Sequence, residues 1–230
     1  MFIHRTQIDF IIKTGITNID KILCDNTNSG FLIEIAGKKG SGKTQLSFLI
    51  CAVSGINNKK IIYAGASGNF RPERIKLMMD KILIDNNESK TYLKNIIYQR
   101  IYEFDDLAKL VKKIKIINFD ILILDDIIPL FLHKFKENTR LEVRNLIREL
   151  SMITLSKKII VLFTNLVIEK VNKDGKGTFL HELFFHDIVR YVHFKFFLKN
   201  HHNNKQVIEC KLIYPYNKKN SKTDLDLGKY

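Results

Sequence analysis

Cysteines and long apolar runs are both scarce in this sequence, and each absence excludes a class of protein. Cys24, Cys51 and Cys210 are odd in number and far apart, without Cys-x-x-Cys or histidine spacing for zinc. They therefore exclude a disulfide framework and indicate a reduced, intracellular compartment. The best apolar run, 121–132, is interrupted by two aspartates and is shorter than the ~20 residues that span a bilayer. We expect a soluble chain without a membrane anchor.

Linkers and internal repeats are also absent from the sequence. Only 3 prolines and 11 glycines occur among the 230 residues, and no Pro/Gly/Ser-rich stretch divides the chain, so one domain is expected. Lysine and arginine total 38 against 24 acidic residues, which gives a formal net charge of +14. Such a charge suits an anionic partner such as nucleic acid, and a solvated basic surface explains it equally well.

Short apolar segments alternate along the chain with segments of helical periodicity. Strands are expected at 31–36, 61–64, 96–98, 121–124 and 159–163. Helices are expected at 44–54, from Pro72 onward, at 107–114, and after a capping box at 139–142. Strands that are apolar on both faces and alternate with helices indicate an α/β fold, with a mostly parallel sheet covered by helices on both sides.

The C-terminal part of the sequence has a different pattern. Residues 189–198 and 207–213 alternate apolar and polar side chains and are joined by a polar turn. They predict an antiparallel hairpin appended to the sheet. We divide the chain into an N-terminal segment at 1–13, a core at 14–213, and a loose, polar C-terminal tail at 214–230.

A phosphate-binding motif lies between the first expected strand and the first expected helix. It matches G-x-x-x-x-G-K-[ST] and consists of Gly37, Lys38, Lys39, Gly40, Ser41, Gly42, Lys43 and Thr44. The glycines allow backbone N–H groups to surround a phosphate, Lys43 can reach the β and γ oxygens of a nucleotide, and the Thr44 hydroxyl can ligate Mg²⁺. The motif predicts a nucleotide site with a bound magnesium ion.

A carboxylate stands at the end of the apolar strand at 121–124. Ligands of open α/β sheets bind at this end of a strand, and the buried strand would hold Asp125 in place. Asp125 is therefore expected to bind Mg²⁺ through water. Asp126 follows directly, and it either shares this role or caps the turn.

The segment 68–75, with the sequence Gly-Asn-Phe-Arg-Pro-Glu-Arg-Ile, resembles a stretch of the RecA/RadA-type recombinases, the eukaryotic strand-exchange proteins and their paralogues. Other elements agree in the same order: 14–20 resembles the entry segment of this family, 42–46 its phosphate loop, and 160–165 its strand ending in Thr-Asn. The chain looks most like a divergent eukaryotic paralogue or the short archaeal RadB type. The resemblance implies a RecA-like P-loop ATPase core, ATP and Mg²⁺ as cofactors, and Arg74 on the adenine side.

Two departures from this family concern ATP hydrolysis. Members that hydrolyse ATP well have a water-activating Glu where this chain has Ser67. Ser67 cannot act as that base, so no catalytic residue is assigned, and Asp126 is the alternative candidate. The family commonly places a Gln that senses the γ-phosphate where this chain has Leu166.

The resemblance also places two DNA-facing loops, at 131–139 and at 169–182. The second carries Lys170, Lys173 and Lys176. A mobile basic loop suits a phosphate backbone, and a solvated surface loop explains these lysines nearly as well.

The resemblance implies an ATP-binding recombinase paralogue that acts in DNA repair by homologous recombination, with weak or absent hydrolysis. An active DNA-dependent ATPase and strand-exchange protein, and a structural adaptor without catalysis, remain alternatives. The expected partners are DNA, with single strands favoured, and a full-length recombinase or another paralogue in a hetero-oligomer. The expected location is the nucleus in a eukaryote or the cytoplasm in an archaeon.

Overall fold

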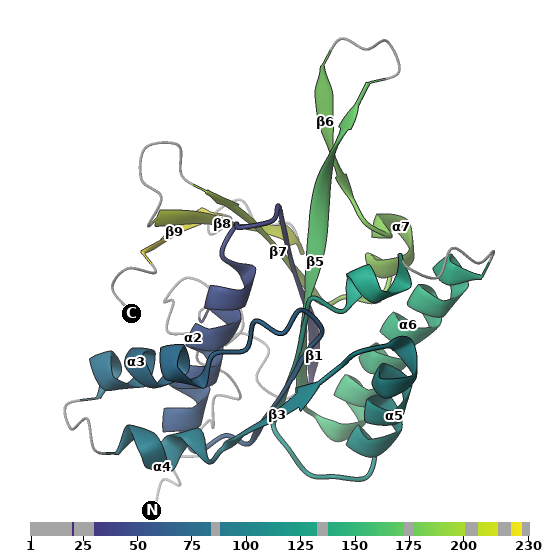
Figure 1. Ribbon diagram of the computed structural model, residues 1–230. Coiled ribbons are helices and arrows are strands. Elements are labelled where there is room, and N and C mark those ends of the chain that lie inside the picture. Colours follow the sequence, from purple (N-terminus) through teal and green to yellow (C-terminus); the bar gives the residue numbers. More distant parts are fainter. Residues whose placement is uncertain are drawn as a thin grey trace, which may run out of the picture.

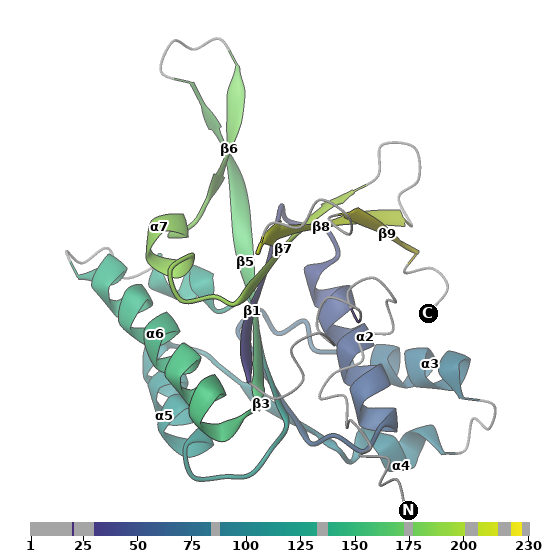
Figure 2. The same cartoon turned by 180° about the vertical axis from the view of Figure 1, so that it is seen from behind.

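The computed structural model contains a central sheet with helices on both faces (Figures 1 and 2). It describes Asp20 and residues 30–83, 88–132, 138–172, 177–200, 207–215 and 222–226. The expectations for the segment 1–13, for most of the entry segment, and for Lys173 and Lys176 lie outside the described residues.

The sheet is parallel through most of its width. Among the described residues its strands lie in the order β3-β2-β4-β5-β1-β7-β8-β9. Their bounds are β1 Phe31–Gly37, β2 Ile61–Gly65, β3 Ile96–Arg100, β4 Ile121–Asp125, β5 Ile160–Val171, β7 Phe194–Asn200, β8 Val207–Tyr214 and β9 Lys222–Asp226. Pairing is parallel from β3 to β7 and antiparallel from β7 to β9. The expected parallel sheet with a C-terminal antiparallel hairpin is confirmed.

Two groups of helices cover the two faces of this sheet. One group contains α2 Lys43–Ile56, α3 Pro72–Ile82 and α4 Ser89–Leu93, and the other contains α5 Phe104–Ile114, the 3-10 helix η1 Ile128–Phe131, α6 Thr139–Lys157 and α7 Phe185–Ile188. Because side chains alternate along a strand, each strand contributes to both cores. In β1, Ile33 packs with the first group and Leu32 with the second. None of the helices within the described ranges is long and apolar enough to span a bilayer.

The second expected DNA-facing loop is largely a β-hairpin. Strand β5 continues to Val171, and β6 (Thr178–Glu182) returns beside it in antiparallel register, from Val167↔Glu182 to Val171↔Thr178. The hairpin projects beyond the sheet, upward in Figure 1. Part of the first expected loop, 133–137, lies outside the described residues.

Two local expectations differ from the structure. Helix α6 begins with Thr139 itself, and its N-cap is Asn138, whose side chain makes no capping hydrogen bond, so the expected capping box is wrong. Part of the expected tail at 214–230 is a strand: Lys222–Asp226 forms β9 and pairs with β8 through backbone hydrogen bonds that a polar segment can also make.

Candidate nucleotide-binding site

The phosphate loop connects the carboxyl end of β1 to the first turn of α2. Gly42 is the N-cap of α2 and has a left-handed backbone with a φ of 87°, and Gly40 has a φ of 78°. Glycine adopts such angles without steric cost. A Cβ on Gly37 would lie 2.3 Å from Ser41 Oγ and 2.7 Å from the carbonyl oxygen of Leu198. The glycines therefore allow the loop to fold tightly, so that backbone N–H groups can surround a phosphate.

Two polar side chains of the loop fit a bound phosphate. The Ser41 hydroxyl is buried and has no hydrogen-bond partner among the described atoms. Lys43 Nζ donates to the carbonyl oxygens of Gly37, over 2.9 Å, and Lys38, over 2.8 Å. Burial lowers the pKa of Lys43, and the charges of Asp126 and Asp125 oppose this shift. A cationic donor thus lies inside the loop, close to two carboxylates.

Three hydroxyl groups surround the carboxylate of Asp125 at the end of β4. Thr44 Oγ1 donates to Oδ2 over 2.9 Å, Tyr63 donates to the same oxygen over 2.8 Å, and Thr164 Oγ1 donates to Oδ1 over 2.9 Å. Burial, and then the charge of Asp125, raise the pKa of Tyr63, so its hydroxyl keeps the proton that it donates. The structure brings together Thr44 and Asp125, the two residues predicted to hold Mg²⁺, and metal binding itself stays a prediction.

Tyr63 and Thr164 were not expected at this site. They come from β2 and β5, the two neighbours of β4, and Gly65 of β2 lies in register with Asp125. The Thr-Asn ending of the strand at 160–165 was noted as a resemblance, but no local signal in the sequence shows that its threonine contacts an aspartate 39 residues earlier. Both contacts depend on strand order.

Asp126 has an unusual backbone and lies beside Ser67. Its φ is 61°, which is uncommon for a residue other than glycine, and its N–H donates to Thr164 Oγ1 over 2.8 Å. The Ser67 hydroxyl lies close enough to the carboxylate of Asp126 to influence its pKa. Burial and the charge of Asp125 raise the pKa of Asp126, while Lys43 and Ser67 lower it. The alternative carboxylate therefore lies against the serine that replaces the expected Glu.

The segment that carries the family resemblance packs beside the site. Phe70 stacks on Tyr98 with ring centroids 4.2 Å apart, and Pro72 stands in the first turn of α3. Arg74 Nε donates to Gln45 Oε1 over 3.2 Å, which places the guanidinium next to the start of α2. The role of Arg74 on the adenine side stays a prediction.

Of the three lysines expected to contact DNA, the structure describes Lys170, on the projecting hairpin. Lys170 is exposed on β5, in register with Phe179 of β6. A separate cavity of about 620 Å³ lies at the base of this hairpin, and Glu182, Phe185 and Arg140 are among its lining residues. No residue of the phosphate loop lines this cavity.

A glycine-rich loop between a parallel strand and a helix, facing an aspartate at the end of β4 in the same sheet, is the arrangement of the P-loop class of α/β proteins. The family model described as Rad51 matches residues 4–182. The chain belongs to the Rad51 family.

Named relatives agree with this family. The chain is 27% identical over 193 residues to DNA repair protein RAD51 homolog A of Zea mays, covering 77% of this chain and 55% of that protein. It is 31% identical over 187 residues to Meiotic recombination protein DMC1 homolog A of Oryza sativa subsp. indica, covering 75% and 53%.

The match to an archaeal relative covers a larger share of both chains than the matches to the plant relatives. DNA repair and recombination protein RadA of Methanococcus maripaludis is 28% identical over 231 residues, covering 89% of this chain and 70% of that protein. The fold is similar to the crystal structure of the RadB recombinase, with a TM-score of 0.67, 18% identity, and coverage of 87% of this chain and 88% of that chain. The chain spans about half the length of the plant relatives.

Proposed function

We propose that this chain binds ATP with Mg²⁺ and acts as a Rad51-family recombinase paralogue in DNA repair by homologous recombination. The observation that carries the proposal is the hydrogen bond from Thr44 to Asp125 beside an intact phosphate loop. Backbone N–H groups of the loop and the Lys43 ammonium would hold the phosphates, and Thr44 and Asp125 would hold the metal. A magnesium ion supplies charge neutralisation between the phosphate oxygens.

We propose slow hydrolysis because the site lacks a Glu at position 67. The Ser67 side chain has no basic group that could activate a water molecule, and its hydroxyl lies beside the carboxylate of Asp126. A positioned general base typically contributes ~10²–10⁴ in rate. Its absence lowers turnover without weakening the loop that binds the nucleotide.

A second candidate function is an active DNA-dependent ATPase that uses Asp126. The position of Asp126 favours it: this carboxylate is half-buried, lies near Lys43, and contacts Ser67 at the place of the missing Glu. Its backbone is held in a strained conformation, and such strain often accompanies functional sites.

DNA is the proposed macromolecular partner, with single strands favoured. The net charge of +14 and the exposed Lys170 on the hairpin support it, and the matched RAD51 and RadA relatives are named as DNA repair proteins. We further propose assembly with a full-length recombinase or another paralogue, in the nucleus if the chain is eukaryotic and in the cytoplasm if it is archaeal. The matched relatives include plant and archaeal proteins.

One pair of measurements tests the proposal. Calorimetry with ATP and Mg²⁺ should show binding by the intact chain, and steady-state ATPase assays with and without single-stranded DNA should show slow turnover. The absence of ATP binding contradicts the proposed function. Fast, DNA-stimulated turnover that Asp126→Asn abolishes would instead favour the second candidate.

A further inference from the structure

The hairpin formed by β5 and β6 is attached to the sheet at its base. Strand β5 pairs with β1 as far as Leu166, in register with Gly37, and from Val167 to Val171 it pairs with β6. The two views agree that this part projects away from the other strands (Figures 1 and 2). Since a two-stranded ribbon is marginal by itself, contacts outside the ribbon determine how firmly the hairpin is held.

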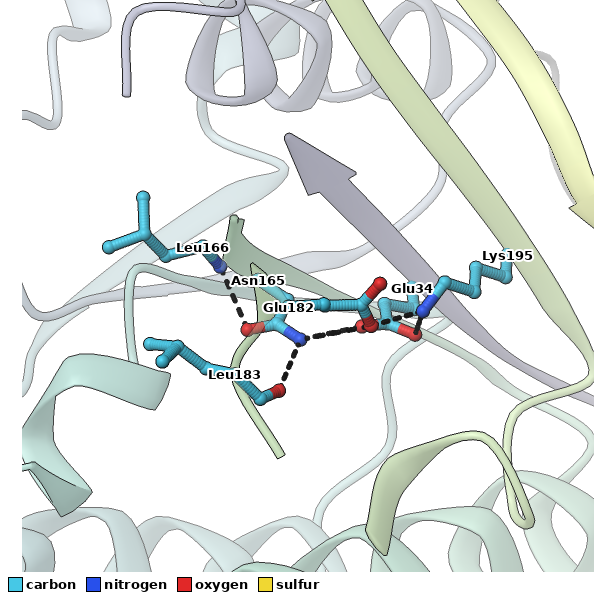
Figure 3. Close-up of polar contacts among 6 residues, drawn as sticks. All are labelled: Glu34, Asn165, Leu166, Glu182, Leu183 and Lys195. Carbon is cyan, nitrogen blue, oxygen red and sulfur yellow. Dashed lines mark hydrogen bonds and ion pairs between the residues drawn. The ribbon is translucent and has the colours of Figure 1, made fainter. Parts of the chain in front are cut away.

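A buried ionic cluster holds the base of the hairpin (Figure 3). Lys195 of β7 lies between Glu182 of β6 and Glu34 of β1, and its Nζ is 3.0 Å from Glu34 Oε2. The Asn165 amide donates to Glu34 Oε1 over 2.7 Å and to the carbonyl oxygen of Leu183 over 3.0 Å. Removing one member of such a cluster leaves a buried charge unpaired, so this base is a firm attachment.

A second, exposed contact joins the hairpin to the phosphate loop. Lys38 Nζ forms an ion pair with Glu169 of β5, and both side chains are about half exposed, at 51% and 52%. Glu169 lies three residues beyond Leu166, within the part of β5 that pairs with β6. Exposed ion pairs are weak, so this contact can open without disturbing the buried cluster.

Lys38 is also coupled to the lysine that should bind the nucleotide. Lys43 Nζ donates to the backbone oxygen of Lys38 over 2.8 Å. A phosphate bound by Lys43 competes for this donor, and its negative charge attracts the nearby Lys38 ammonium away from Glu169. Leu166, the residue of β5 beside Gly37, is apolar and cannot respond to a phosphate.

We propose that Lys38 exchanges Glu169 for the polyphosphate of a bound nucleotide, and that this exchange releases the projecting part of the hairpin while the buried cluster keeps its base in place. The inference rests on the proposed binding of ATP. It makes Lys38 a second phosphate-binding side chain and makes the hairpin, which carries Lys170, responsive to the nucleotide.

The test measures amide hydrogen exchange in 167–171 and 178–182 of the intact chain, with and without saturating ATP and Mg²⁺, alongside calorimetry of ATP binding. Exchange in both strands should become faster when ATP binds, because opening free energy sets the rate of local exchange. Glu169→Gln should exchange fast in both states and should bind ATP about two- to fivefold more tightly, the range set by the strength of an exposed ion pair.

Matched variants separate this contact from general charge effects. Lys112→Gln removes an exposed charge from α5, outside the phosphate loop, and should keep the ATP-dependent change, whereas Lys38→Gln should lose it. Glu103→Gln removes an exposed glutamate far along the sequence and should leave the change intact. In a double-mutant cycle, adding Glu169→Gln to the Lys38→Gln variant should not change the rate of amide hydrogen exchange in the hairpin any further.

The outcomes distinguish the inference from the function on which it rests. One result is that calorimetry shows bound ATP while amide hydrogens of the hairpin exchange at the same rate with and without ATP. That result overturns the switch of Lys38 from Glu169 to the phosphates and leaves ATP binding in place. If the intact chain gives no binding signal, the proposed function and this inference are both overturned.

Discussion

Tyr63 donates its buried hydroxyl to Asp125 Oδ2 over 2.8 Å, from the neighbouring strand of the sheet. Thr44 uses the same oxygen, over 2.9 Å. A metal ion held by Thr44 would use a lone pair of its hydroxyl oxygen and leave the proton for Asp125, and Tyr63 and Thr164 hold the same carboxylate from the two flanking strands. The strand order thus provides Asp125 with support that does not depend on the phosphate loop.

Replacing Tyr63 with Phe tests this support. The variant should lose about 1–2 kcal/mol of unfolding free energy, because a hydrogen bond to a charged acceptor is removed in the core. It should also need a higher Mg²⁺ concentration for half-maximal ATP binding. Urea titration and calorimetry at several Mg²⁺ concentrations measure both effects. Tyr98→Phe is the matched control, since Tyr98 stacks on Phe70 at the edge of the sheet; equal Mg²⁺ dependence in both variants would contradict the role of Tyr63.

Replacing Lys43 with Ala should reduce the affinity for ATP with Mg²⁺ by roughly 10- to 100-fold, because charge-assisted hydrogen bonds contribute about 1.5–3 kcal/mol each. The fold should persist, since the present partners of Lys43 are backbone oxygens at the partly exposed loop. Calorimetry measures the affinity, and circular dichroism checks the fold. Unchanged affinity in a folded variant would remove the phosphate loop from the proposal.

Position 67 should limit the rate of hydrolysis. Ser67→Glu places a carboxylate where the family has its water-activating residue, and ATP turnover should rise by at least about tenfold, which is part of the ~10²–10⁴ that a fully positioned base contributes. Ser67→Gln has a side chain of the same length without the basic group, and it should show no increase. Steady-state phosphate release measures both variants. A similar gain in both would assign the effect to packing near Asp126.

DNA binding should depend on salt and on the lysines of the second expected DNA-facing loop. Neutralising Lys170, Lys173 and Lys176 together should reduce the slope of log affinity against log salt by up to ~2 units, because each phosphate contact with single strands contributes roughly 0.7. Fluorescence anisotropy with labelled single strands over a salt series measures the slope. If the slope is unchanged, the DNA contacts lie on another surface of this basic chain.

The sequence predicts local features of the site well and distant contacts poorly. The phosphate loop and Asp125 are visible because each is a short motif at the end of an apolar strand. Tyr63 and Thr164 reach Asp125 only because β2 and β5 flank β4, and strand order does not follow from local patterns. The motif therefore indicates which residues bind, and the fold decides which residues orient them.

The hairpin and β9 are strands that the pattern of apolar residues does not predict, for a different reason. Much of the ribbon beyond Leu166 is exposed, including the first three residues of β6, so its apolar periodicity is weak. In β9 only Leu225 is buried among the side chains that the structure describes, and the strand depends on pairing with β8. Backbone pairing without a buried face leaves little trace in the pattern of apolar residues.

Glu34 should make stability depend on pH. Burial, followed by the charge of Glu182, raises the pKa of Glu34 to about 8, although Lys195 acts in the opposite direction. The usual pKa of an unfolded Glu is about 4.3. Between these values the folded chain binds more protons than the unfolded chain, so the free energy of unfolding falls as pH rises from about 5 to about 8. The contribution is complete at lower pH and is lost above the folded pKa.

Glu34→Gln isolates this contribution from that of the other titrating groups. The wild type should lose stability with a slope of at most about 1.4 kcal/mol per pH unit from this residue, and the variant should lack that part of the slope. Glu142→Gln, in the first turn of α6 and partly exposed, should retain the wild-type slope. Urea unfolding at half-unit steps from pH 5 to pH 9 measures the difference. Parallel curves for wild type and Glu34→Gln would mean that Glu34 is ionised in the folded chain throughout this range, with Lys195 stabilising its charge against burial.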